Sequence, residues 1–186
     1  MRILLTTTSF TDTPGEHLEK LKSLNYKIDI LRGPIKEEIL LPIISKYDGI
    51  ICGDDEITRK VISNGKNGKL KVISKYGIGL DKIDLKSADE FGIKVCKTPG
   101  VNHVTVSEHI LALLFSYYKN IHLEYNITKQ GKWERLIGHE IYGKKIGIVG
   151  YGRIGYELAQ RSKALGLIVK AYDPYATNKL INDSKV

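Results

Sequence analysis

Short β-rich runs alternate with amphipathic stretches through the first hundred residues, and this alternation restricts the possible folds more than any other feature of the chain. The β-rich runs are Arg2–Thr7, Lys27–Leu31, Gly49–Cys52, Lys71–Ser74 and Lys94–Cys96. The helical stretches between them are Gly15–Leu24, Lys36–Ser45, Thr58–Ser63 and Leu85–Phe91. Repetition of strand and helix at this spacing predicts an α/β fold, with a parallel sheet covered by helices on both faces.

The segment Thr98-Pro99-Gly100 breaks this alternation. A long helical pattern follows from Val104 to Lys119, mixed helix continues to Gln130, and a loop leads to Tyr142. A second α/β unit comes next, with the expected elements Lys145–Val149 (strand), Arg153–Leu165 (helix) and Ile168–Tyr172 (strand). We therefore expect two domains, residues 1–100 and residues 101–186, the second stopping after a single βαβ unit, where a complete dinucleotide-binding domain has about six strands.

Composition excludes several classes of protein. The 186 residues include 42% hydrophobic residues and carry a net charge of +8, which is ordinary for a globular protein. The longest apolar run, Ile110–Phe115, is far shorter than the roughly 20 residues that cross a bilayer, and the N-terminus lacks the features of a signal peptide. We therefore expect a cytoplasmic protein without membrane contact.

The cysteines and the positive charge suggest neither a metal site nor a nucleic-acid interface. Cys52 and Cys96 lie in separate strand-like runs, outside any CxxC or Cys/His ligand spacing, so we expect no disulfide and no zinc. The lysines are scattered along the chain, whereas nucleic-acid-binding proteins tend to cluster Arg and Lys on one face. The charge favours a mild attraction for anionic ligands.

The motif Gly150-Tyr151-Gly152-Arg153-Ile154-Gly155 is the strongest indication of function. A GxGxxG pattern alone is weak, but here a predicted strand precedes it and a predicted helix follows it. Gly150 would make the tight turn, Gly152 would let a diphosphate approach the backbone, and Gly155 would let the helix pack closely on the sheet. The free N–H groups at the helix start would then bind the phosphates.

Asp173 follows the next strand, at the position where a carboxylate accepts hydrogen bonds from the adenosine ribose. Its charge would repel a 2′-phosphate, so the pattern favours NAD over NADP. The alternative is a glycine-rich turn with an incidental aspartate.

A second glycine loop, Lys75-Tyr76-Gly77-Ile78-Gly79-Leu80-Asp81, follows the strand Lys71–Ser74. It would lie at the carboxyl end of that strand, where ligands bind in open α/β sheets. Its backbone N–H groups could hold a small anion such as a carboxylate. The alternative is a structural turn into a helix capped by Asp84.

Four motifs together resemble the D-2-hydroxyacid dehydrogenases, and within them the D-3-phosphoglycerate dehydrogenase-like proteins. They occur in the family's order over nearly the whole chain: residues 71–84, residues 98–109, Gly131-Lys132-Trp133 and residues 143–174. The resemblance implies a flavodoxin-like substrate domain followed by the first βαβ of a Rossmann NAD-binding domain. It also implies hydride transfer between NAD and a small 2-hydroxy or 2-oxo acid, bound between the domains.

On the substrate side, the resemblance implies that the amides of Gly77, Ile78 and Gly79 hold the substrate carboxylate. Lys75 stands where phosphoglycerate-type members often carry an Arg, and Asn102 would line the cleft.

On the nucleotide side, the resemblance implies that Arg153 and Ile154 cover the diphosphate. The helix from Val104 would be the interdomain hinge, and Trp133 would lie on a dimerisation arm, so a homodimer is expected.

Two departures from the family pattern affect the expected activity. Phosphoglycerate-type members usually have an Arg-Ser pair after the third strand, where this chain has Gly53-Asp54-Asp55-Glu56, a poor environment for a substrate phosphate. The family's catalytic Arg, Glu and His are expected beyond Val186, so no residue of this chain is assigned a catalytic role and the chain is expected to be inactive alone. A hydride-transfer enzyme needs such an acid/base group.

Two further hypotheses remain open at this point. One is a non-catalytic module that binds a dinucleotide or offers a dimerisation surface. The other is contact with nucleic acid through the positive charge, which would make binding depend steeply on salt.

Overall fold

The computed structural model describes residues 1–175. The chain forms two compact units, one made of residues 1–99 and one that begins at Gly100. Each unit has its own sheet and its own hydrophobic cluster.

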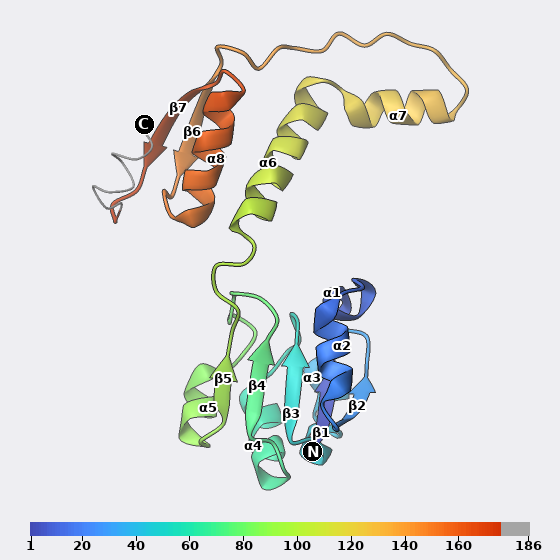
Figure 1. Ribbon diagram of the computed structural model, residues 1–186, viewed down its shortest axis with the longest axis vertical. Helices are drawn as coiled ribbons and strands as arrows, with labels where there is room; N and C mark the ends of the chain where they lie inside the picture. Colours follow the sequence, from blue (N-terminus) through green and yellow to red (C-terminus); the bar gives the residue numbers. More distant parts are fainter. Residues whose placement is uncertain (176–186) are drawn as a thin grey trace. The chain divides into compact units, whose positions relative to one another are not determined.

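The first unit is built on a five-stranded parallel sheet with the strand order β2-β1-β3-β4-β5 (Figure 1). The strands are β1 (Arg2–Leu5), β2 (Lys27–Ile30), β3 (Gly49–Cys52), β4 (Val72–Lys75) and β5 (Lys94–Cys96). Parallel pairing throughout and this strand order confirm the predicted flavodoxin-like α/β domain. In such a sheet all the carboxyl ends of the strands lie at one edge, where ligands bind.

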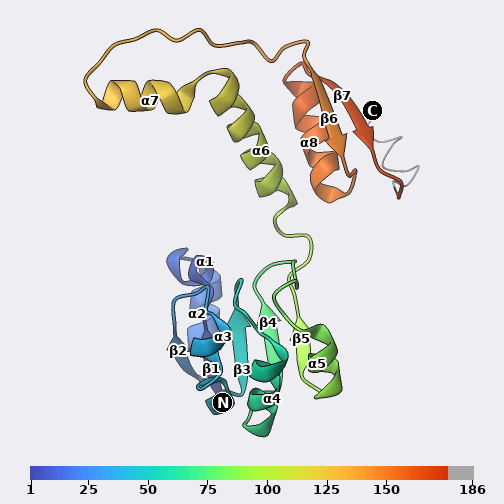
Figure 2. The same cartoon turned by 180° about the vertical axis from the view of Figure 1, so that it is seen from behind.

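Helices cover both faces of this sheet, with α2 on one face and α3, α4 and α5 on the other (Figures 1 and 2). The helices of the unit are α1 (Thr8–Asp12), α2 (Glu16–Ser23), α3 (Glu37–Leu40), α4 (Arg59–Asn67) and α5 (Leu85–Glu90), with a 3-10 turn at Ile44–Lys46. The main hydrophobic core joins Leu4, Ile50 and Ile73 of the strands to Leu40 and Ile62 of the helices. Alternate strand residues therefore point into one closed core.

Three local predictions for this unit were incomplete. The stretch Lys36–Ser45 was expected to form one helix, but it splits into α3 and the 3-10 turn because Pro42 lacks an N–H and cannot continue a helix. Helix α4 runs beyond the expected end at Ser63, since Gly65 lies inside the helix and packs against Leu70. The short helix α1 was not predicted.

The second unit begins with two consecutive helices and a long connection. Helix α6 (His103–Tyr118) ends near Asn120, whose left-handed backbone turns the chain into α7 (Ile121–Lys129). The segment from residue 130 to residue 144 then contains no helix or strand, as expected.

A parallel βαβ unit follows, made of β6 (Lys145–Val149), α8 (Arg153–Ala164) and β7 (Ile168–Tyr172), as predicted (Figure 1). Its cluster of buried residues joins Leu111 of α6 to Ile148 of β6 and Leu158 of α8. Helix α6 therefore belongs to the core of the second unit.

Within residues 1–175, no helix combines the length and the apolar character that crossing a membrane requires.

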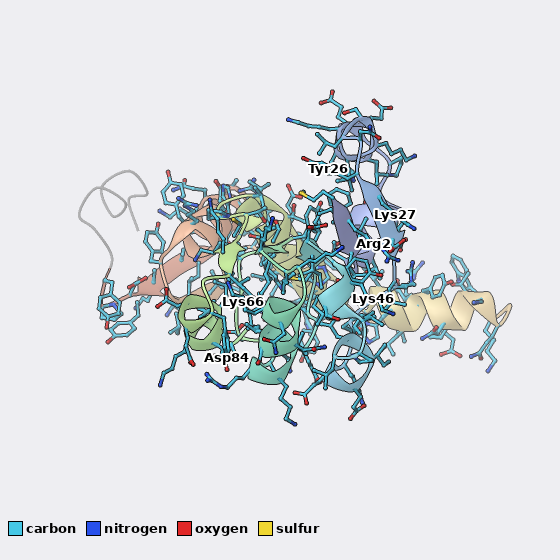
Figure 3. All side chains as sticks on the ribbon, turned by 90° about the horizontal axis from the view of Figure 1, so that it is seen from below. Arg2, Tyr26, Lys27, Lys46, Lys66 and Asp84 are labelled. Carbon is cyan, nitrogen blue, oxygen red and sulfur yellow. The ribbon has the colours of Figure 1, made fainter. Side chains whose placement is uncertain are left out.

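Seen along one end of the first unit, Arg2 and Lys27 lie near β1 and β2, while Lys66 lies apart on α4 (Figure 3). Arg2 is also neutralised by an ion pair with Asp29.

Candidate functional site

The glycine motif of the second unit forms the turn between β6 and α8. Gly150 has a φ of +96°, in the region that favours glycine, and its N–H donates to the carbonyl of Tyr172 on the neighbouring strand. The first intrahelical bond of α8 runs from the N–H of Tyr156 to the carbonyl of Gly152. The amides of Arg153, Ile154 and Gly155 therefore have no carbonyl partner inside the helix and are available to an anion.

The three glycines of this motif differ in how much space a side chain would have at each position. A Cβ on Gly155 would lie 2.1 Å from the carbonyl oxygen of Gly150, so only glycine permits this packing. A Cβ on Gly150 or Gly152 would meet no atom within 4 Å. The space beside these two residues is open, which is the shape that close approach of a diphosphate to the backbone requires.

Asp173 lies next to this turn, at the end of β7. Its carboxylate accepts hydrogen bonds from the N–H groups of Tyr175 at 2.7 Å and Tyr151 at 2.6 Å. These two bonds hold the pKa of Asp173 below its usual range, so the group is an anion at neutral pH. Each carboxylate oxygen keeps a lone pair for a ribose hydroxyl.

Arg153 and Asn102 both lie near the start of the second unit. The guanidinium of Arg153 is packed so closely on Gly100 that a Cβ there would lie 2.3 Å from its Nη1. Asn102 precedes the first residue of α6, and its Oδ1 is buried without a hydrogen-bond partner among residues 1–175. A buried acceptor without a donor is costly, which makes Asn102 a group that a bound ligand could satisfy.

The second glycine loop lies at the carboxyl end of β4 in the first unit. The N–H of Gly77 donates to Oγ1 of Thr98 at 2.9 Å, and the N–H of Thr98 donates to the carbonyl of Gly77 at 2.9 Å. The loop is therefore tied to the chain that follows β5. The amides of Ile78 and Gly79 donate to no group within residues 1–175, so these two, rather than all three predicted amides, are free for an anion.

Lys75, the last residue of β4, is buried, and its ammonium group is held by the loop after the adjacent strand β3. Nζ donates to the carbonyl of Gly53 and to Oδ1 of Asp54, both at 2.6 Å. The Lys75 side chain is 7% exposed and that of Asp54 is 83% exposed. Asp54 of the acidic stretch after β3 thus forms an ion pair with Lys75, the residue expected to contact the substrate.

Asp55 is an important residue whose role could not be inferred from the sequence. It is completely buried and accepts hydrogen bonds from the N–H groups of Ile35 at 2.6 Å and Gly53 at 3.0 Å, as well as from the hydroxyl of Thr6. A single carboxylate therefore fixes the loop after β3 against the ends of β1 and β2. The one available signal was its position at the carboxyl end of a buried strand.

A pocket of about 100 Å³ opens at this edge of the first unit. Its lining consists of Thr6, Thr7, Thr8, Gly33, Pro34, Gly53 and Asp54. The pocket is small and polar, and it lies where the ends of β1 and β3 meet.

The described residues show neither a reactive Cys52 thiol nor a cluster of metal ligands. Burial raises the pKa of the Cys52 thiol to about 12, so it is not a nucleophile. No group of three or more His, Cys, Asp or Glu side chains within residues 1–175 is placed to hold a metal ion.

The second unit thus has a βαβ unit with an open glycine turn, and the first has a parallel α/β sheet with a loop of free amides, so each offers backbone N–H groups to an anion. The family described as D-isomer specific 2-hydroxyacid dehydrogenase, catalytic domain, matches residues 4–183. The chain belongs to this family, which confirms the resemblance seen in its motifs.

Similar proteins include several named dehydrogenases. The D-3-phosphoglycerate dehydrogenase of Archaeoglobus fulgidus is 34% identical over 167 residues, covering 88% of this chain and 31% of that protein. The hydroxypyruvate reductase of Thermotoga maritima is 37% identical over 151 residues, covering 80% of this chain and 49% of that protein. The chain thus spans about a third to a half of the length of these relatives.

Among solved structures, the NAD+-bound 3-phosphoglycerate dehydrogenase of Entamoeba histolytica superimposes with a TM-score of 0.71 and 26% identity. The match covers 97% of this chain and 56% of that one.

Proposed function

We propose that this chain provides the substrate domain and the dinucleotide-binding turn of an NAD-dependent 2-hydroxyacid dehydrogenase. The reaction is transfer of a hydride between NAD and a small 2-hydroxy or 2-oxo acid. The observation that carries the proposal is the open glycine turn with Asp173 fixed beside it, which suits a diphosphate and an adenosine ribose together. Family membership and the NAD+-bound relative support this assignment.

The residues of the turn fit the dinucleotide. Gly150 and Gly152 leave room for the diphosphate, and the amides of Arg153 and Ile154 are oriented to bind it. Asp173 would accept the ribose hydroxyls, and its negative charge favours NAD over NADP. When bound, NAD supplies the hydride acceptor, and the chain's own groups hold and orient it.

On the substrate side, we assign the carboxylate to the amides of Ile78 and Gly79. Two N–H donors on a loop without a competing partner form an anion site. Gly77 contributes by shaping the loop, because its own N–H is used by Thr98. Lys75 and Asn102 remain our candidates for contacts with the rest of the acid.

The proton that accompanies the hydride needs a general acid/base close to the substrate hydroxyl. We assign this role to none of the residues present, and we propose that the 186 residues by themselves bind ligands without turning them over. We further propose a homodimer, supported by the strong exposure of Trp133 and Ile137 in the connection after α7.

The proposal predicts that NAD binds to the chain as it stands and that Gly152→Ala weakens this binding. The added methyl group meets no protein atom but fills the space assigned to the diphosphate, so affinity should fall by at least roughly tenfold with little change in stability. Titration calorimetry with NAD measures the affinity, and thermal unfolding measures the stability.

Gly147→Ala is the matched control, because a Cβ there also meets no atom within 4 Å and lies inside β6, away from the turn. It should bind NAD as the unmodified chain does. Equal NAD affinity of the Gly152→Ala variant and the unmodified chain would overturn the proposed site. Oxidation of NADH by the purified chain with hydroxypyruvate would overturn the proposed need for further residues.

A further inference from the structure

The two cations beside the pocket of the first unit are already paired with carboxylates. The ammonium of Lys75 is held by Asp54 and by the carbonyl of Gly53, each at 2.6 Å. Arg32, which precedes the pocket residue Gly33, donates through both terminal nitrogens to the carboxylate of Asp12, at 2.9 and 2.6 Å. An anionic group that entered the pocket would have to compete with these carboxylates.

The loop that carries Asp54 is rigidly fixed. Its neighbour Asp55 is buried and accepts three hydrogen bonds, from Ile35, Gly53 and Thr6. A Cβ on Gly33 would lie 2.7 Å from both the Asp55 carboxylate and the Thr6 carbonyl, so the partner loop is equally constrained. The backbone beside residue 54 is therefore held in place, and the Asp54 side chain lines the pocket with its carboxylate exposed.

The pocket is also small. Its volume of about 100 Å³ is well below the roughly 300–1,000 Å³ of a typical ligand pocket. That space suits a short side chain with a hydroxyl or methyl group. The hydroxyls of Thr6, Thr7 and Thr8 line it as uncharged hydrogen-bonding groups.

We propose that Asp54 is a specificity-determining residue that restricts the substrate to a small acid with a single negative charge. This inference rests on the proposed function, in which the Ile78 and Gly79 amides hold the one carboxylate. The loops that carry these amides and Asp54 follow neighbouring strands and are joined by the bond from the Tyr76 N–H to the Cys52 carbonyl. A phosphate or a second carboxylate that entered the pocket would meet the exposed Asp54 carboxylate, whose partner Lys75 is buried. Like charges brought together disfavour binding.

The test compares two acids that differ only by a phosphate, hydroxypyruvate and 3-phosphohydroxypyruvate. Both are titrated into the isotope-labelled 186-residue chain while the NMR signals of the Ile78 and Gly79 amides are followed. Hydroxypyruvate should bind at least roughly tenfold more tightly than its phosphorylated form. Asp54→Asn should remove most of this difference, because it deletes the repelling charge and frees Lys75.

Asp89→Asn is the matched control. It removes the same charge from an exposed residue near the C-terminal end of α5, which connects to the amino end of β5 and therefore lies at the opposite edge of the sheet. This variant should keep the tenfold preference. Unchanged signals from β2 and β5 will verify that Asp54→Asn leaves the fold intact, as expected for a side chain that is 83% exposed.

Equal binding of the two acids to the unmodified chain would overturn the role of Asp54, as would an unchanged preference in Asp54→Asn. Either result leaves the proposed dehydrogenase function standing, since NAD binding and the carboxylate site would be intact. If neither acid shifts Ile78 or Gly79, both this inference and the substrate half of the proposed function fail, while the NAD titration still tests the other half separately.

Discussion

Both units contain a parallel sheet with a glycine turn at the carboxyl end of a strand, but they differ in how deeply the sheet is buried. In the first unit, Ile50 and Ile73 at the centre of the sheet are at most 1% exposed. In the second, Val149 of β6 is 88% exposed and Tyr172 of β7 is 67% exposed. Two parallel strands with one helix layer bury little apolar surface, whereas five strands covered on both faces form a closed core.

The starts of two helices show a second difference. Helix α5 begins at Asp84, whose side chain accepts a hydrogen bond from the N–H of Ser87 at 2.9 Å. Helix α8 begins at Gly152 without any side-chain cap. A capped start satisfies its own amides and contributes to stability, whereas an uncapped start leaves them for a ligand. The comparison teaches that α5 satisfies its first amides with its own side chain, whereas α8 leaves its first amides open to a ligand.

The largest expected effect concerns the cores. Ile73→Ala should lower the free energy of unfolding of the first unit by about 2–5 kcal/mol, because it leaves a cavity in a fully buried site. Val149→Ala in the second unit should change stability by less than about 0.5 kcal/mol, since that side chain is mostly exposed. Denaturant unfolding of both variants measures the two changes. Similar losses for the two substitutions would contradict the described difference in packing.

Hydrogen exchange sharpens the comparison without any mutation. In a dilute monomeric sample, the amides of β6 and β7 should exchange at least roughly tenfold faster than those of β3 and β4. The reason is that the second sheet has little buried surface to oppose local opening. Protection of β6 equal to that of β3 would show that the small sheet is as stable as the large one.

The strands and their pairing could be predicted because their signal is local. The runs at Gly49–Cys52 and Lys145–Val149 match the observed strands residue for residue. The turns were less certain, because tertiary contacts decide them. Gly65 was expected to lie beyond a helix end, but it lies inside α4, where the absence of a Cβ permits contact with Leu70.

The sequence predicted where the candidate site lies, but not which groups hydrogen-bond to one another there. The sequence indicated an anion loop at residues 75–81, but it could not show that Thr98 takes the Gly77 amide. It also could not distinguish the two adjacent aspartates after β3. Asp55 is buried and accepts hydrogen bonds from Ile35 and Thr6, while Asp54 is exposed and pairs with the buried Lys75. Such contacts between distant segments leave no local pattern.

The smallest expected effect concerns the cap of α5, where Asp84 lies at the helix start (Figure 3). Its hydrogen bond from Ser87 holds the pKa of Asp84 below its usual range. A carboxylate with a lowered folded-state pKa contributes stability above its unfolded pKa of about 3.9, and this contribution disappears as the pH falls through the folded-state value. Asp84→Ala should therefore lower the melting temperature by a few degrees at pH 7.

The same substitution should have almost no effect in acid, where the carboxyl group of the unmodified chain is already protonated. Asp89→Ala near the end of the same helix removes an equal charge without removing a cap, so it should leave the melting temperature nearly unchanged at both pH values. Thermal unfolding of the three proteins across the acid range separates the two cases. Equal melting temperatures of Asp84→Ala and Asp89→Ala at pH 7 would show that the side-chain cap does not stabilise α5. The described contrast between the starts of α5 and α8 would then not hold.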